Sequence, residues 1–128
     1  SRVVRMLDAL TIAPNLFWRE PDLEAIARAE ARAEVSDAQV SEDIALALDY
    51  LKGVPAADLN RIGVAGYCQT GRHPLAFASS PQGTNRIHAC VVFHGAAYPR
   101  EWTLNAEKMI PYDELIAQSQ VPVFGATT

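Results

Sequence analysis

Short apolar runs alternate with longer amphipathic segments along this chain. The runs are rich in β-branched residues and are bounded by Pro, Gly and Asn, which predicts buried strands at 10–13, 61–66, 89–94 and 121–124. Because these strands are apolar on both faces and helical segments separate them, we expect a mostly parallel sheet covered by helices on both sides, that is, a three-layer α/β architecture. The residues before 10 are interpreted as the tail of a helix that leads into the first strand.

The clearest helix begins at Ser36. Ser36 occupies a cap position and Gln39 follows three residues later, which is the pattern of a capping box. Apolar residues then recur at helical spacing over 40–51, and Gly53 ends the pattern. Further helices are expected at 21–34, 69–78 and 113–118. The acidic side chains of the predicted helices are interpreted as a solvated face: Asp22, Glu24, Glu42 and Asp43.

Composition and charge narrow the class of protein. The chain has 128 residues, enough for one domain over 1–128, and its 49% apolar and 20% charged residues are ordinary for a globular protein. The net charge of −4 comes without a block of Lys or Arg, so we expect neither a nucleic-acid nor a membrane partner. The sequence shows no secretion signal, which favours a cytoplasmic location, and Ser1 in place of Met suggests processing or an excised piece.

The stretch GYCQTG places Cys68 directly between a predicted strand and a predicted helix. Ligands of open parallel sheets bind outside the carboxyl ends of the strands, and Cys68 falls on that edge. A sharp strand-to-helix turn strains the backbone of its central residue and requires small neighbours, which Gly66 and Gly71 supply. We therefore interpret Cys68 as an exposed nucleophile rather than a packed thiol.

The residues after Cys68 support the same chemistry. A helix N-terminus carries partial positive charge, and Arg72 and His73 in its first turn are expected to favour the thiolate. The backbone N–H of Gln69 is expected to face a developing oxyanion. His94 ends the strand 89–94 on the same edge and is a candidate base, although a histidine that only caps a strand end remains an alternative. His73 is interpreted as a satisfied surface residue.

Other cysteine chemistries fit the sequence less well. No second cysteine lies three residues from Cys68, and Pro74 stands where a phosphate-binding cysteine loop needs arginine. The spacing of the histidines and cysteines matches no zinc pattern, so we expect neither a metal nor another cofactor. Cys90 lies inside an apolar run and is interpreted as a buried, inert thiol.

Four residues near the predicted strand ends are candidates for substrate binding. Arg19 and Arg100 each follow a strand and are positioned to hold an anionic group, although surface arginines are common. Trp18 and Tyr98 are candidates for an apolar pocket, with core or lid packing as the alternative.

Four segments of the chain resemble the dienelactone hydrolase family: APNLFWR, GYCQTG after VAG, VVFHGAAYPR and VPVFG. The resemblance covers nearly the whole chain and implies an α/β-hydrolase fold whose cysteine nucleophile opens cyclic enol-lactones and related esters. Position by position, it implies that Cys68 is the nucleophile, that Gln69 supplies an oxyanion N–H, and that Gly66 and Gly71 are the glycines of the turn. Thr70 stands where the family usually has glycine, and its branched side chain is expected to crowd the turn.

The resemblance also implies missing parts. In the family, the aspartate of the triad follows the strand that matches VPVFG and the histidine comes later, whereas this chain ends at Thr128. The resemblance likewise implies that the family's N-terminal strands are lacking here. The first hypothesis is a carboxymethylenebutenolidase-like hydrolase that acts on lactones or small carboxylic esters through a Cys68 acyl-enzyme. The alternative is a non-catalytic, truncated α/β-hydrolase module that needs self-association or a partner. Uncovered sheet edges and faces lead us to expect a homo-oligomer.

Overall fold

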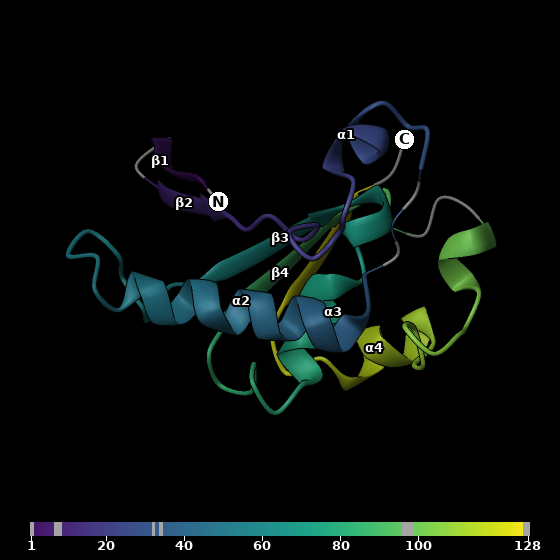
Figure 1. Cartoon of the computed structure of the whole chain (residues 1–128). Coiled ribbons are helices and arrows are strands. Elements are labelled where there is room, and N and C mark those ends of the chain that lie inside the picture. The colour runs from purple at the N-terminus through teal and green to yellow at the C-terminus, as the bar shows by residue number, and fades with distance from the viewer. Residues whose placement is uncertain (1, 7–8, 32, 34, 96–98, 127–128) are drawn as a thin grey trace.

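The computed structural model describes the chain except for residues 1, 7–8, 32, 34, 96–98 and 127–128 (Figure 1). Its main sheet is parallel, has the strand order β3-β4-β5, and consists of β3 (Gly63–Tyr67), β4 (Ala89–Phe93) and β5 (Val123–Ala126). A separate antiparallel hairpin is formed by β1 (Arg2–Met6) and β2 (Ala9–Ala13). The expected α/β class with a mostly parallel sheet is confirmed, whereas the helix tail expected before residue 10 is wrong, because a strand lies there.

The helices begin and end where local chemistry places them. They are α1 (Leu23–Ala27), α2 (Asp37–Leu51), α3 (His73–Ser79) and α4 (Tyr112–Gln118), with 3-10 turns η1 (Cys68–Thr70) and η2 (Pro99–Trp102). The capping box before α2 is confirmed, since Gln39 N donates to Ser36 Oγ over 3.1 Å and Ser36 N to Gln39 Oε1 over 3.4 Å. Helix α1 is shorter than expected, and the left-handed φ of 59° at Ala29 lies just beyond its end.

Pro74 explains why α3 begins late. The sequence predicted a helix from residue 69, but α3 begins at His73 and puts Pro74 in its first turn. A proline there removes only an N–H that has no partner within the helix. The preceding residues form η1 instead.

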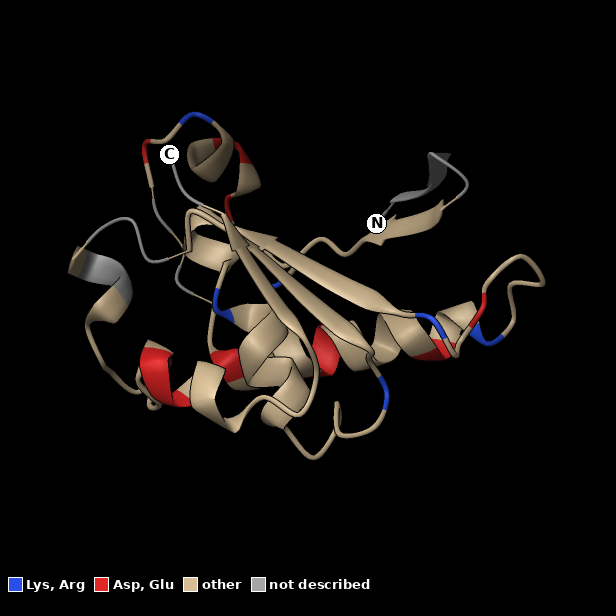
Figure 2. Ribbon diagram, turned by 180° about the vertical axis from the view of Figure 1, so that it is seen from behind, with Lys and Arg blue, Asp and Glu red and all other residues tan. Residues whose placement is uncertain are grey.

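One face of the main sheet is covered by helices and carries the core. Helices α2, α3 and α4 lie on this face (Figure 1; from behind in Figure 2). The buried side chains come from α2, from α3 and α4, and from β4: Val40, Ile44, Leu48, Leu75, Phe77, Leu115, Cys90 and Val92. The sheet therefore gains its hydrophobic stabilisation from this side.

The opposite face of the sheet is apolar and open among the described residues. Tyr67 and Phe124 are each 62% exposed, and Tyr67 stacks on Phe93 with ring centroids 4.8 Å apart. Of the three layers expected from the sequence, the described part of the chain thus supplies the sheet and one layer of helices. Among the described helices, none combines the length and the apolar character that crossing a bilayer requires.

Candidate active site

Cys68 stands at the crest of the turn between β3 and α3. It directly follows Tyr67, the last residue of β3, and its backbone has a left-handed φ of 53°. Residues other than glycine rarely adopt this conformation, and in folded proteins it concentrates at functional sites. The side chain of Cys68 is exposed. The turn thus presents a thiol to solvent at the carboxyl edge of the sheet.

Gly66 and Gly71 are required by close approaches of the backbone. A Cβ atom at Gly66 would lie 2.2 Å from the carbonyl oxygen of Thr70, and one at Gly71 would lie 2.5 Å from the Cα atom of Gly95. Neither position has room for a side chain without a backbone shift. The predicted need for small residues on both sides of Cys68 therefore has a direct steric basis.

Thr70 closes the turn instead of crowding it. Its hydroxyl accepts a hydrogen bond from Tyr67 N and donates one to Tyr67 O, both over 2.9 Å. A glycine at this position would lack both bonds. The branched residue thus ties the end of η1 back to the last residue of β3.

His94 occupies the equivalent place on the neighbouring strand. It directly follows Phe93, which pairs in register with Tyr67, so His94 and Cys68 leave adjacent strands at the same level. His94 also has a left-handed φ of 53°, and its N–H donates to Ala126 O over 2.8 Å. The structure therefore brings the candidate nucleophile and the candidate base to one edge. The left-handed turn at His94 was not foreseen, although the following Gly95 is a signal for it.

Gln69 directly follows Cys68 in η1, and the role expected for it rests on its backbone N–H. Its side chain is turned away, since Nε2 donates to the carbonyl oxygen of Ala33 over 2.7 Å. Its amide is the first after Cys68 in η1, and the first amides of a helical turn have no acceptor within that turn. A backbone donor thus directly follows the residue that carries the thiol, and its contact with an oxyanion stays a prediction.

Arg72 and His73 face α2 instead of the thiol. Arg72 forms a bidentate ion pair with Asp37, and His73 Nδ1 lies 3.4 Å from Asp37 Oδ1. His73 is buried, so its interpretation as a surface histidine is wrong. Burial alone raises the pKa of the Asp37 carboxyl, but contacts with His73 and Arg72 outweigh burial and lower that pKa below its ordinary value. No local pattern in the sequence indicates this cluster, because Asp37 and Arg72 are far apart along the chain.

Arg19 and Trp18 are also bound to α2. Arg19 Nη1 and Nη2 each donate to the Asp43 carboxylate over 2.9 Å, and Trp18 Nε1 donates to Asp43 Oδ1 over 3.2 Å. The solvated role expected for Asp43 is wrong, because Asp43 is only 6% exposed. Trp18 lines a groove of about 440 Å³ between the loop after β2 and α2. Contact of Arg19 or Trp18 with a substrate stays a prediction.

The remaining candidates contribute less to the described site. Tyr98 lies outside the described residues, and Arg100 lies in η2 but its side chain is not described. Cys90 is buried as expected, and desolvation raises its thiol pKa to about 11. Within the described residues, no group of three or more His, Cys, Asp or Glu side chains is arranged to hold a metal ion.

Known proteins resemble this chain in sequence. The model of the dienelactone hydrolase family matches residues 10–127. A protein of Methylorubrum extorquens named "Putative carboxymethylenebutenolidase" is 27% identical over an alignment of 131 positions, which covers 97% of this chain and 42% of that protein. The chain thus spans less than half the length of this relative. No solved structure matches the chain.

Proposed function

Because the chain belongs to the dienelactone hydrolase family, we propose that Cys68 is the nucleophile of a hydrolase acting on lactones or small carboxylic esters. The observation that carries the proposal is the left-handed turn at Cys68, which exposes the thiol directly before the backbone amide of Gln69. A plain packed thiol, such as Cys90, needs neither strain nor exposure. The family name and the name of the relative support hydrolase chemistry, and the assignment of that chemistry to Cys68 is part of the proposal.

The proposed first step is acyl transfer to sulfur. The Cys68 thiolate attacks the carbonyl carbon, the carbon–oxygen bond of the ester breaks, and the acyl group remains on Sγ as a thioester. The negative charge of the tetrahedral intermediate falls on the former carbonyl oxygen, where the backbone N–H of Gln69 is the proposed donor. In a lactone, the departing oxygen stays attached to the acyl chain.

His94 is the proposed base within this chain. It takes the thiol proton and returns it to the departing oxygen, and its position at the end of β4 supports this role. Water then attacks the thioester, releases the carboxylic acid and restores the thiol. Arg19, Trp18, Tyr98 and Arg100 are proposed contacts for the remainder of the substrate.

The test uses p-nitrophenyl acetate with wild-type protein, Cys68→Ala and the matched control Cys90→Ala. We expect release of p-nitrophenol from the wild type and from Cys90→Ala, and none above background from Cys68→Ala. A burst of one equivalent without turnover would show a live nucleophile that lacks a deacylating group. Equal release by wild type and Cys68→Ala would contradict the proposal and favour a non-catalytic module.

A further inference from the structure

Arg72 is a buried arginine in the short link between the cysteine turn and α3. Its side chain is 1% exposed. Nε donates to Asp37 Oδ1 over 2.9 Å and Nη2 donates to Asp37 Oδ2 over 2.8 Å. Nη2 also donates to the carbonyl oxygen of Ile110 over 2.8 Å. A bidentate pair of this kind fixes orientation as well as distance, so Arg72 joins its own segment rigidly to the start of α2 and to the residues before α4.

The same cluster supports the turns that carry Cys68 and His94. Gly71 precedes Arg72, and its N–H donates to the carbonyl oxygen of Cys68 over 3.0 Å. The ring of Tyr112 has its centroid 5.9 Å from the guanidinium carbon of Arg72. The Tyr112 hydroxyl fills the space beside both turns, since a Cβ atom would lie 2.8 Å from it at Gly71 and 2.2 Å from it at Gly95.

Stability alone does not account for a buried ion pair at this place. The free energy needed to remove two charges from water is about as large as the attraction gained between them. Replacement of a buried ion pair by apolar residues is therefore often neutral or stabilising. A left-handed cysteine, in contrast, persists only where the surrounding structure holds it. A rigid, directional contact four residues after Cys68 meets that need.

We propose that Arg72, oriented by Asp37, is a positioning residue that holds the Cys68 turn in its reactive geometry. This inference rests on the proposed role of Cys68. Arg72 itself points away from the thiol and touches no reacting atom. Its loss is therefore expected to slow acylation of Cys68 without changing how tightly the ester binds.

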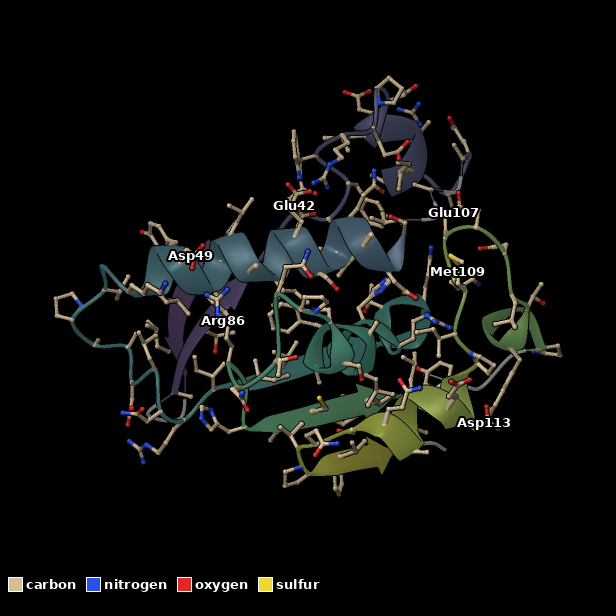
Figure 3. All side chains as sticks on the ribbon, turned by 90° about the horizontal axis from the view of Figure 1, so that it is seen from below. Glu42, Asp49, Arg86, Glu107, Met109 and Asp113 are labelled. Atoms are coloured by element: carbon tan, nitrogen blue, oxygen red, sulfur yellow. The ribbon has the colours of Figure 1, made fainter. Side chains whose placement is uncertain are left out.

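The test compares wild type, Arg72→Lys and the double variant Arg72→Met/Asp37→Leu. Lysine keeps the charge but lacks the planar fork, and the double variant removes Arg72 and Asp37 together, so that neither of these two charges is left without the other. His73 loses its contact with Asp37 in the double variant, whereas Arg72→Lys keeps Asp37 in place. The matched control is Arg86→Met/Asp49→Leu, which removes an arginine–aspartate pair (Nη2 to Oδ1, 2.7 Å) at the other end of α2 (Figure 3). Thermal unfolding of each variant shows that it is folded. The readouts are the acylation rate constant at saturating p-nitrophenyl acetate, the half-saturating concentration, and the rate of Cys68 alkylation by iodoacetamide.

We expect both Arg72 variants to lower the acylation rate constant by about 10- to 100-fold, as displacement of a reacting group does, with half-saturation unchanged within about two-fold. Alkylation of Cys68 is expected to slow at least about three-fold, because the turn no longer holds the thiol exposed at its crest. The control should match wild type in every readout. Folded Arg72 variants with wild-type acylation and alkylation would overturn the inference. If wild type is alkylated at Cys68 but releases no p-nitrophenol, the proposed function fails, and the alkylation rates still decide the role of Arg72.

Discussion

Replacement of Gly66 by alanine perturbs the cysteine turn most directly. The new Cβ atom would lie 2.2 Å from the carbonyl oxygen of Thr70 and 3.0 Å from the Cα atom of Gly71, whereas ordinary contacts begin near 3.4 Å. Both neighbours are backbone atoms, so no side chain can rotate away to make room. The backbone of the turn must therefore move by roughly 1 Å. Forced packing of this kind lowers the free energy of unfolding by about 1–3 kcal/mol. Replacing glycine by alanine also lowers the entropy of the unfolded chain, which raises the free energy of unfolding by only about 0.4–1 kcal/mol. Gly66→Ala is therefore expected to be destabilised.

The same strand supplies the control for this prediction. A Cβ atom at Gly63 would meet only the carbonyl oxygen of Ala89, at 3.9 Å, so Gly63→Ala should be neutral or slightly stabilising. Denaturant unfolding measures both variants, and p-nitrophenyl acetate measures acylation of Cys68. We expect Gly66→Ala to lose about 1–2 kcal/mol of stability and to acylate about 100-fold more slowly. A Gly66→Ala protein as stable and as reactive as Gly63→Ala would refute the steric reasoning.

Three further predictions concern other parts of the structure. Thr70→Val keeps the branched shape but loses both hydrogen bonds to Tyr67, so its free energy of unfolding, measured with denaturant, should fall by about 1–2 kcal/mol. Thr70→Ser keeps the hydroxyl and should stay near wild type. Equal stability of wild type, Thr70→Val and Thr70→Ser would contradict the closure of the turn by Thr70. Because the pKa of Asp37 is lowered in the folded state, its contribution is present above the ordinary aspartate pKa and is lost as pH falls through the lowered value. Asp37→Asn should therefore be less stable at neutral pH and show a weaker loss of stability in acid titrations, and an acid profile parallel to wild type would contradict this. The open apolar face predicts that the protein self-associates. Phe124→Ser should weaken this self-association, whereas the control Leu46→Ser, at an exposed apolar position on α2, should not. Sedimentation at several protein concentrations measures the association, and a wild-type protein that stays monomeric would contradict the prediction.

Features that depend on neighbours in sequence could be predicted well. A few consecutive residues are enough to predict each of three features: the capping box at Ser36, the alternation of strands and helices, and the sharp turn at Cys68. His94 could be placed on the correct edge of the sheet because parallel strands end together. The helix expected at 69–78 instead begins at His73, although the signal for its late start, Pro74, is local.

Features that depend on distant residues could not be predicted. Arg72 and Asp37 meet only because α2 and α3 pack side by side, and no periodicity in either segment indicates that contact. Asp43 has the sequence context of a solvated carboxylate, yet the loop after β2 covers it and supplies Trp18 and Arg19 as partners. The strand β1 was missed because its pairing with β2 is a property of the hairpin and not of the segment alone.

The nucleophilic role of Cys68 is tested most directly by the mass of the acylated protein. Wild-type protein is mixed with p-nitrophenyl acetate, quenched in acid within the burst, and digested for peptide mass spectrometry. We predict one added acetyl group on the peptide that contains Cys68 and none on the peptide that contains Cys90, whose thiol is buried. An unmodified Cys68 under conditions in which p-nitrophenol is released, or acetylation spread over surface lysines alone, would contradict a nucleophile at this turn.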